Sequence, residues 1–520
     1  MSLVDLRKAE KPLEVEADVC IVGAGAAGLF LAAALTNALR KVVILEAGDN
    51  VCADATSLGF LPVFTGAEYL GATLGRAFGL GGSTSRWGGL LIPHSVHDVS
   101  AATAETATIW RHIVATVEKN TERVLQHLGF SVGGDFHQFA AAKLGAVVND
   151  LDAAGFATLA AQFMPLSKRH FGYLLSTVRE PAAQPIVFIN AVCNRWRMGA
   201  SADANGRVAE VGAVSTNGRT VTVKAKEVVV AAGTIESTRI LLEMTELQHL
   251  DLASTDLGSC LSDHLSCPVA TVGPEDYAAV ASRFRPRFSG PCLRTFRFVE
   301  KQPLPSSPRY FCHFIFDVDN AALTVTKEAI AALQGRRLPR FKLGQVLSAP
   351  GGLVALAFAR YARSCLYIPS GSPVHLQLDI EQIPDTSNRI VLGDERDAYG
   401  RRRPHIHWRI TEQDSTNIRR AARRMLEAWP GERAGLPELH PTALEDDAAK
   451  PYDAYHPVGT CRMGDDAHAV VELDLRVKGT TNLSVLSTAV LPSAGTANPT
   501  FTLLCFAQAL ADQLTGRLEA

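Results

Sequence analysis

The 520-residue sequence predicts an α/β protein with two domains, one built on a mostly parallel sheet and one on a mainly antiparallel sheet. Three observations support this prediction. The chain is longer than a single hydrophobic core usually supports. A strand, a glycine-rich turn, a helix and a second strand follow one another within residues 17–46, as in a parallel α/β unit. Apolar and polar residues alternate in several stretches of residues 374–411, as in antiparallel strands with one covered face.

The N-terminal segment has the pattern of a Rossmann-like dinucleotide site. The run Val19–Val22 is apolar throughout, as in a buried parallel strand. Gly23, Gly25 and Gly28 follow with G-x-G-x-x-G spacing. In such a motif the glycines permit a tight turn, let the backbone approach a pyrophosphate, and let the next helix pack closely on the strand.

The helix after these glycines is predicted from Ala26 to Leu39, so its N-terminus would direct N–H groups at the phosphates. A second strand, Val42–Leu45, ends in Glu46, 21 residues after Gly25. A carboxylate at this position accepts a hydrogen bond from a ribose hydroxyl and repels a 2′-phosphate. A purely structural strand-turn-helix is the alternative, and it leaves Glu46 unexplained. The motif alone does not separate FAD from NAD.

Two further segments have the composition of a loop or turn that contacts the same dinucleotide. Residues 79–93, GLGGSTSRWGGLLIP, combine small residues with a tryptophan, as in a backbone that passes close to a flat, polar molecule. Residues 227–242, EVVVAAGTIESTRILL, predict a buried strand, a small-residue turn and a helix start. The expected cofactor contacts in these segments are Gly82, Ser83, Arg86, Trp87, Gly88, Ala232 and Gly233.

The C-terminal part carries the candidate chemistry. The sequence YHPVGTCRMG places His456 before a proline and a glycine turn. Further on, Asn498 and Pro499 precede an apolar helix that is predicted to begin at Thr500. The N-terminus of that helix can stabilise negative charge on a ligand.

Taken together, these motifs resemble the glucose-methanol-choline (GMC) family of FAD-dependent oxidoreductases. The GTANPT motif at residues 495–500 is similar to that of the branch with pyranose oxidases and bacterial sugar dehydrogenases. The middle of the chain resembles the family only loosely. The matching segments, in family order, are residues 17–50, 75–93, 226–242 and 452–514.

The resemblance implies FAD as the cofactor and assigns roles to the C-terminal pair. His456 would be the base that takes the alcohol proton, since a neutral imidazole can do so near neutral pH. Asn498 would hold the same oxygen, and hydride would pass to flavin N5. Arg86 stands where pyranose oxidases have a histidine that tethers the flavin, so the FAD is expected to be non-covalent. Ser487 replaces an acid found in many relatives. The expected cofactor contacts also include Gly23, Gly25, Ala26, Gly28, Glu46, Asn498, Pro499 and Thr500.

The resemblance also implies how the chain is divided. A Rossmann-like FAD-binding domain would be assembled from discontinuous segments, and an α+β substrate or cap domain would take the remainder. The FAD-binding segments would be residues 14–100, 185–266 and 447–520, and the substrate or cap segments residues 101–184 and 267–446.

In the middle of the chain, residues 374–382 and 389–395 are predicted to be antiparallel strands joined by the turn formers 385–388, and residues 404–411 continue the alternation. These strands are expected to turn one face to the active site. His405, His407 and Trp408 are interpreted as strand residues, and Arg402 and Arg403 as a solvated turn.

Two uncharged or apolar segments bear on location. Residues 19–39 have the length of a membrane span, but the preceding residues are net acidic and three glycines interrupt the run, so neither a span nor an export signal is expected. Residues 336–363 are apolar with basic flanks and are broken by Pro350 and two glycines, so they cannot span a membrane as one helix. They are expected to cover the substrate entrance, or alternatively to touch a membrane or partner surface.

Charge and cysteine usage narrow the partners. Lysines and arginines number 51 against 53 acidic residues, without a long basic run, so no nucleic-acid partner is expected. Ten cysteines are scattered singly, without C-x-x-C pairs or grouped histidines, so no metal site is expected and a cytoplasmic location is favoured.

The predicted function is FAD-dependent oxidation of an alcohol, on a sugar, glycoside or polyol. The alternatives are a non-redox lyase with a structural flavin, a flavin-containing binding protein without turnover, or a non-sugar alcohol substrate. The electron acceptor, whether oxygen, a quinone or a redox protein, is left open.

Overall fold

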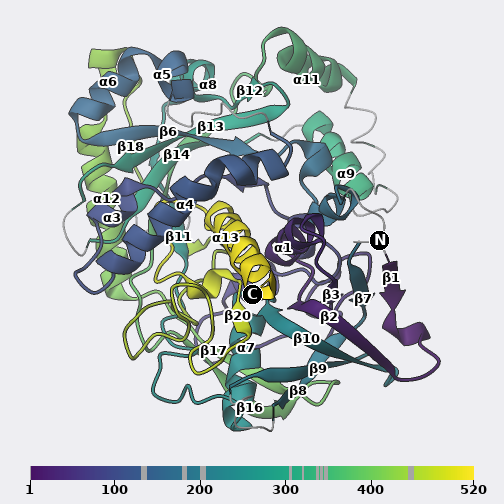
Figure 1. Ribbon diagram of the computed structural model, residues 1–520. Coiled ribbons are helices and arrows are strands. Elements are labelled where there is room, and N and C mark those ends of the chain that lie inside the picture. The colour runs from purple at the N-terminus through teal and green to yellow at the C-terminus, as the bar shows by residue number, and fades with distance from the viewer. Residues whose placement is uncertain are drawn as a thin grey trace.

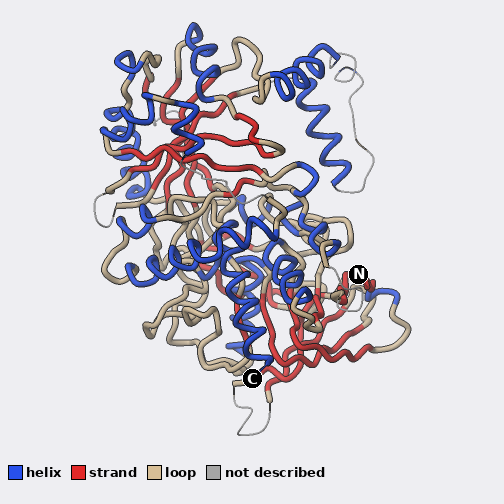
Figure 2. Tube along the Cα trace, turned by 45° about the horizontal axis from the view of Figure 1, so that its top comes forward, coloured by secondary structure: helices blue, strands red, loops and turns tan. Residues whose placement is uncertain are grey.

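A computed structural model gives the arrangement of the chain (Figure 1). Figure 2 shows two groups of strands, one in the upper and one in the lower part of the view, with helices between and around them. Each group draws its strands from segments that are far apart in the sequence. The described residues are 2–130, 138–178, 184–199, 206–303, 307–318, 321–334, 350–442 and 450–519, together with Pro339 and Gly344.

The first sheet is mostly parallel and has the strand order β1-β7-β3-β2-β10-β9-β8, with β20 paired to the end of β10. From β1 to β10 all pairs are parallel, whereas β9 and β8 add an antiparallel edge. The strands are β1 (Ser2–Asp5), β2 (Leu13–Val22), β3 (Val42–Leu45), β7 (Ile186–Ile189), β8 (Val192–Met198), β9 (Val208–Val214), β10 (Thr220–Val230) and β20 (Leu483–Val485).

The N-terminal strand-turn-helix forms as the sequence predicts. In β2 the first half alternates and is partly exposed, whereas the apolar half that ends at Val22 is buried between β3 and β10. Helix α1 (Ala26–Asn37) follows directly and is buried along most of its length, because its side chains are apolar on all sides. It packs against α13 (Thr500–Glu519), and α4 (Ala107–His127) packs on α13 in turn (Figure 1). The two ends of the chain therefore share one hydrophobic core.

The second sheet is antiparallel, with the order β18-β11-β15-β14-β13-β6-β5, and β12 and β19 pair at its sides. One face of this sheet carries a separate core that includes Leu376, Leu378 and Phe298. The predicted fold class, a Rossmann-like domain with a mainly antiparallel α+β domain, is confirmed. The strands are β5 (Leu90–Leu91), β6 (Phe156–Phe163), β11 (His264–Thr271), β12 (Arg287–Ser289), β13 (Cys292–Glu300), β14 (Tyr310–Phe316), β15 (Val374–Glu381), β18 (His440–Pro441) and β19 (Tyr452–Asp453).

A third, small sheet corrects part of the prediction for residues 389–411. The predicted turn after β15 is present, since Asp385 accepts hydrogen bonds from the backbone of Ser387. Strand β16 (Arg389–Arg396) then leaves the second sheet and pairs with β17 (Arg402–His407), which also pairs with β4 (Val63–Phe64). The alternation was therefore interpreted correctly as strand, but the partner was wrong, because alternation indicates one covered face and not which element covers it.

The interpretation of Arg402 and Arg403 as a solvated turn was also wrong. Both residues open β17. Arg402 binds the Glu246 carboxylate with Nη1 at 2.7 Å and the Gly393 carbonyl with Nε at 2.6 Å, and Arg403 donates to the Leu61 carbonyl at 2.9 Å. Long charged side chains at a strand edge thus join the small sheet to its neighbours.

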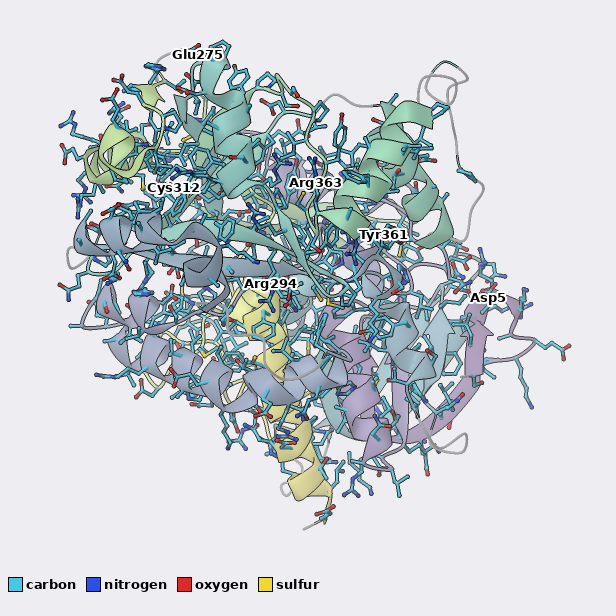
Figure 3. The ribbon with its side chains drawn as sticks, turned by 90° about the horizontal axis from the view of Figure 1, so that it is seen from above. Asp5, Glu275, Arg294, Cys312, Tyr361 and Arg363 are labelled. Carbon is cyan, nitrogen blue, oxygen red and sulfur yellow. The ribbon has the colours of Figure 1, made fainter. Side chains whose placement is uncertain are left out.

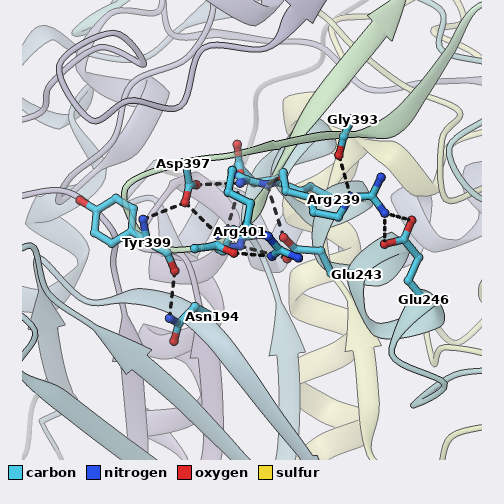
Figure 4. A network of polar contacts seen from close by, with 12 residues as sticks. Asn194, Arg239, Glu243, Glu246, Gly393, Asp397, Tyr399 and Arg401 are labelled. Carbon is cyan, nitrogen blue, oxygen red and sulfur yellow. Dashed lines mark hydrogen bonds and ion pairs between the residues drawn. The ribbon is translucent and has the colours of Figure 1, made fainter.

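Buried ion pairs attach helix α7 (Gly233–Glu246) to this hairpin (Figure 4). The fully buried Arg239 binds Asp397 at 2.7 Å and Glu236 at 3.3 Å. Arg401 binds Glu243 at 2.8 Å. The neighbouring arginines keep the pKa of the buried Glu236 carboxyl below its usual value despite desolvation. Each buried charge in this network therefore has a partner of opposite sign, as burial of charge requires.

The remaining helices cover the second sheet or lie at its rim. Of the segment 336–363, residues 336–338, 340–343 and 345–349 lie outside the described residues. The rest contains α11 (Pro350–Ala362), which begins at the proline and packs against α9. Figure 3 labels Tyr361 and Arg363, which lie at the C-terminal end of α11. Every helix among the described residues is too short or too polar to span a bilayer. The other helices are α2 (Leu70–Thr73), α3 (Val96–Ser100), α5 (Gln138–Leu144), α6 (Ala146–Ala153), α8 (Tyr277–Phe284), α9 (Ala321–Gln334) and α12 (Glu412–Ala428).

The predicted domain limits stay a prediction, and two features bear on them. Strand β1 begins before residue 14 and still belongs to the first sheet. Helix α4 falls in the segment 101–184 and yet packs on α13 in the core of the first sheet. A division that follows the cores would therefore place residues 2–5 and 107–127 with the first sheet.

Candidate active site

A cavity of about 640 Å³ opens where β2, β3 and β10 end, at the carboxyl edge of the parallel strands. Ligands of open α/β sheets bind at this edge. The cavity brings together residues from both ends and the middle of the chain. Its lining includes Gly23, Gly25, Ala26, Glu46, Gly82, Ser83, Arg86, Trp87, Gly88, Ala232, Gly233, His456, Asn498, Pro499 and Thr500.

Gly28 is the one predicted site residue that does not line the cavity. A Cβ atom on Gly28 would lie 2.1 Å from the carbonyl oxygen of Gly23, so this glycine allows α1 to pack against the turn. Gly23 has a φ of +109°, and a Cβ atom there would lie 2.6 Å from the Ala231 carbonyl oxygen. The glycines thus bring the β2 turn against the end of β10, as the motif predicts.

Glu46 holds the turns around the cavity together. Its carboxylate accepts hydrogen bonds from the backbone N–H groups of Ala24 at 2.7 Å, Gly48 at 2.8 Å and Gly79 at 2.8 Å. Burial nevertheless raises the pKa of this carboxyl above its usual value. These backbone N–H groups hold the carboxylate of Glu46 in the wall of the cavity.

The second glycine-rich loop lies directly over the first. A Cβ atom on Gly82 would lie 2.9 Å from Cα of Gly25, so the two backbones approach as closely as glycine permits. Trp87 donates from its indole N–H to the Arg169 carbonyl at 2.8 Å, which fixes the ring in the cavity wall. Arg86 lines the same wall.

The loop that carries His456 is held from two sides. Asp263 accepts the backbone N–H of His456 at 2.9 Å with each oxygen, and it also accepts a hydrogen bond from the hydroxyl of Tyr69. Thr234, in the first turn of α7, donates to the Pro457 carbonyl at 2.7 Å. The position of the histidine is thus fixed by its backbone, before any side-chain contact.

The imidazole of His456 lies between two polar side chains. Its Nε2 atom is 2.8 Å from Nδ2 of Asn498, and its Nδ1 atom is 3.2 Å from Nδ1 of His264. His264 is buried, and its Nε2 atom is 2.8 Å from the Gly495 carbonyl oxygen. The structure therefore brings the two predicted catalytic side chains into direct contact.

These contacts determine the tautomer of His456. The Gly495 carbonyl can only accept, so Nε2 of His264 carries the hydrogen and Nδ1 of the neutral ring is the acceptor. Nδ1 of His456 must then be the donor in the pair, which leaves the lone pair of His456 on Nε2. Asn498 donates to that lone pair with Nδ2. The basic nitrogen thus faces the cavity, where a substrate would lie.

The protonation state of His456 agrees with this arrangement. Desolvation, followed by repulsion from the neighbouring His264 ring, lowers the pKa of His456 to about 3. Burial lowers the pKa of His264 as well. Both rings are therefore neutral at neutral pH, and His456 has a free lone pair under the conditions in which a base is needed.

Two residues of this constellation were missed by the sequence analysis, His264 and Arg297. His264 begins β11, and Arg297 on β13 donates from Nη2 to the carboxamide oxygen of Asn498 at 2.6 Å. Both are single polar residues within strands that are distant in sequence from the motifs. Only a pairing of these strands with the C-terminal loop could have indicated them, and one sequence does not show that pairing.

A larger cavity of about 1780 Å³ adjoins the first and shares the wall residues Arg86, Trp87, Leu90 and Phe163 with it. It is lined mainly by the second sheet and by α9 and α11, with Arg297 at the boundary with Asn498. Ser487, noted above as a departure, also lines the smaller cavity, where its hydroxyl caps the short helix after β20.

Comparisons with known proteins agree with this site. Residues 384–507 match the family model described as GMC oxidoreductase, and residues 21–71 match a model described as NAD(P)-binding Rossmann-like domain. An oxygen-dependent choline dehydrogenase from Citrobacter koseri is 41% identical over 64 residues, which make up 12% of each protein. The choline oxidase from Arthrobacter globiformis is 35% identical over 97 residues, 18% of each protein. The chain thus matches less than a fifth of the length of these curated relatives.

Solved structures are similar over the whole chain. Pyridoxine 4-oxidase from Mesorbium loti aligns over 96% of this chain and 99% of its own, with a TM-score of 0.57 and 18% identity. Formate oxidase from Aspergillus oryzae aligns over 97% and 99%, with a TM-score of 0.54 and 16% identity. At such identities the likeness supports the fold.

Proposed function

We propose that this chain, whose residues 384–507 match the GMC oxidoreductase family model, is an FAD-dependent enzyme that oxidises an alcohol to a carbonyl compound, with His456 as the base. The observation that carries this proposal is the contact between Nε2 of His456 and Nδ2 of Asn498 in the wall of the cavity. It places one lone pair and one N–H group where a single alcohol oxygen can meet both.

The residues around the cavity fit FAD. The glycines of both loops leave the backbone uncovered, the N-terminus of α1 opens on the cavity, and Glu46 lines the cavity at the position where the motif has the acceptor for a ribose hydroxyl. Bound there, FAD would accept the hydride that leaves the alcohol carbon. Arg86 lines the wall and cannot form the histidine link of pyranose oxidases, so we propose that the FAD is held without a covalent bond.

The protein's own part is to position the alcohol and remove its proton. On binding, the alcohol O–H replaces the carboxamide N–H at Nε2 of His456, and Asn498 donates to the alcohol oxygen instead. His456 then takes the proton, while Asn498 stabilises the negative charge that develops on the oxygen. His264 accepts from Nδ1–H throughout, so the imidazolium that forms keeps its orientation.

Anaerobic mixing of the FAD-loaded protein with a panel of sugars, polyols, hydroxy acids and simple alcohols tests the proposal. An alcohol-oxidising enzyme must bleach the flavin absorbance, whereas a lyase with a structural flavin, or a binding protein without turnover, leaves it unchanged. His456→Ala should slow flavin reduction by about 10²- to 10⁴-fold. His405→Ala is a matched control, since that histidine lies on β17 and pairs with Glu395. Equal rates in His456→Ala and the wild type would overturn the assignment of the base.

We further propose that the substrate is a sugar, glycoside or polyol. The GTANPT motif supports a sugar, glycoside or polyol, by its likeness to the pyranose oxidase branch. Product identification after the anaerobic experiment would name the oxidised carbon. Reoxidation of the reduced flavin by air, by a quinone or by a redox protein would identify the electron acceptor.

A further inference from the structure

Arg297 lies where the two cavities meet, and only part of its guanidinium has hydrogen-bond partners. Its Nη2 atom donates to the carboxamide oxygen of Asn498 at 2.6 Å, and the group stacks on the ring of Phe311 at 3.9 Å. The residue is 4% exposed. Its Nη1 atom is buried and has no hydrogen-bond partner. A buried N–H group without a partner is costly, and more so on a cation.

In the part of the chain that the structure describes, Arg297 also has no counterion. Among the described residues, no carboxylate oxygen lies within 4 Å of its guanidinium, whereas Arg309, just before the neighbouring strand β14, binds Glu381 at 2.8 Å. Burial lowers the pKa of Arg297, and the charge of Asp379 acts against this shift. The two oxygens of Asp379 already accept hydrogen bonds from Ser266 and His313. The Nη1 side of the guanidinium is therefore without an anion among the described residues.

The larger cavity supplies an independent observation. Leu293, Thr295 and Arg297 alternate along β13 and so present one face to this cavity. Among the described lining residues there are five cationic side chains and one carboxylate, Asp317. A cavity lined by one sign of charge concentrates ligands of the opposite sign. The cationic side chains are Arg86, Arg169, Arg297, Lys327 and Arg360.

We propose that the substrate is an alcohol that carries a carboxylate, and that the Nη1 side of Arg297 binds this carboxylate while His456 and Asn498 hold the hydroxyl group. This inference rests on the proposed alcohol oxidation and narrows its substrate class to hydroxy acids, sugar acids included. A guanidinium fork matches a carboxylate in geometry and charge. Because Arg297 also fixes the carboxamide oxygen of Asn498, it couples recognition of the anion to the orientation of the catalytic pair.

A binding experiment without turnover tests the anion site. The FAD-loaded protein is titrated with sodium acetate, sodium phosphate or acetamide, and the shift of the flavin absorbance spectrum is followed. Acetate should bind and acetamide should not. Arg297→Met should weaken acetate binding by about 10- to 100-fold, as expected for loss of a charged hydrogen bond. Arg297→Lys, which keeps the charge without the fork, should give an intermediate value.

Controls make each outcome decisive. Arg294→Met changes an arginine of the same strand that donates to Gln162 instead, and it should bind acetate as the wild type does. Melting temperatures of all variants show whether the fold is intact. Equal acetate binding by the wild type and Arg297→Met overturns the proposal. Phosphate that binds more tightly than acetate, and is lost in Arg297→Met, overturns the carboxylate in favour of a phosphorylated alcohol.

A turnover experiment separates this inference from the proposed function. Hydroxy acids and their methyl esters are compared as reductants of the flavin under anaerobic conditions. Arg297→Met should raise the ratio of the KM for the acid to the KM for the ester by about 10- to 100-fold, because both substrates lose the contact that holds Asn498 but only the acid loses the anion contact. Esters that reduce the flavin as well as the acids do, in both proteins, overturn the substrate class and leave alcohol oxidation standing. If neither class reduces the flavin while acetate still binds through Arg297, the proposed function fails and the anion site remains.

Discussion

Two buried arginines show how differently this molecule treats the same side chain. Arg239, in the ion-pair network on α7, has three carboxylates and a backbone carbonyl around its guanidinium. Arg297, on β13, has one carboxamide oxygen, an aromatic ring and an Nη1 atom without a partner. The fold itself supplies partners for the guanidinium of Arg239, whereas under our proposal a bound carboxylate completes those of Arg297. A buried charged side chain whose N–H groups lack partners thus indicates a binding site more directly than a charged side chain that is merely buried.

The sharpest test of this contrast is Arg239→Met. Removing the guanidinium leaves the carboxylates of Glu236 and Asp397 buried with fewer partners, so the free energy of unfolding should fall by about 3–5 kcal/mol. Thermal and denaturant unfolding of the FAD-loaded protein measures the loss. Acetate binding should be unchanged at temperatures below the transition. A loss of stability under about 1 kcal/mol would mean that the network is not what holds α7 to the hairpin.

The second prediction concerns the tautomer of His456. In His264→Leu the acceptor for Nδ1–H is lost, so the ring can place its hydrogen on Nε2 and present no lone pair to the alcohol. Flavin reduction should slow by about 10- to 100-fold, within the range of general-base effects. His264→Gln offers a carbonyl oxygen at a similar reach and should recover part of the rate. Equal rates in both variants would show that packing around His264, and not its hydrogen bond, matters.

The third prediction is that Arg297, unlike Arg239, contributes little to stability. Arg297→Met should change the free energy of unfolding by no more than about 1 kcal/mol, because replacing an unpaired buried charge by an apolar chain removes a desolvation cost that offsets the lost hydrogen bond. Unfolding curves measured beside those of Arg239→Met give the comparison directly. A loss of 3 kcal/mol or more would place Arg297 with the structural ion pairs.

The smallest expected effect is that of pH on the base. A pKa lowered to about 3 keeps His456 neutral above that pH, and the base form is lost only as the pH falls through about 3. The rate of flavin reduction should therefore show no step from this residue between about pH 5 and 8. Rapid-mixing measurements with a neutral alcohol and with a hydroxy acid test this. A step near pH 6.5 that His456→Ala removes would show that the imidazole is solvated during the reaction.

Much of the fold and half of the candidate site could be predicted from the sequence. Gly23, Glu46 and the strands around them depend on local patterns, and the structure places them as those patterns indicate. His264 and Arg297 could not be predicted, because their importance comes from strand pairing and from the return of the C-terminal loop. The error at β16 has the same origin, since alternation does not name the partner strand.

The site is assembled from distant segments of the chain, and this determines when activity appears during folding. The backbone of His456 is held by Asp263, its ring touches Asn498 and His264, and Arg297 holds Asn498 in place. These residues come from chain segments that adjoin only when both sheets are complete. During refolding, we therefore expect secondary structure to return early and catalysis to return last, so that enzymatic turnover reports the finished tertiary structure better than any spectroscopic signal of helix or strand.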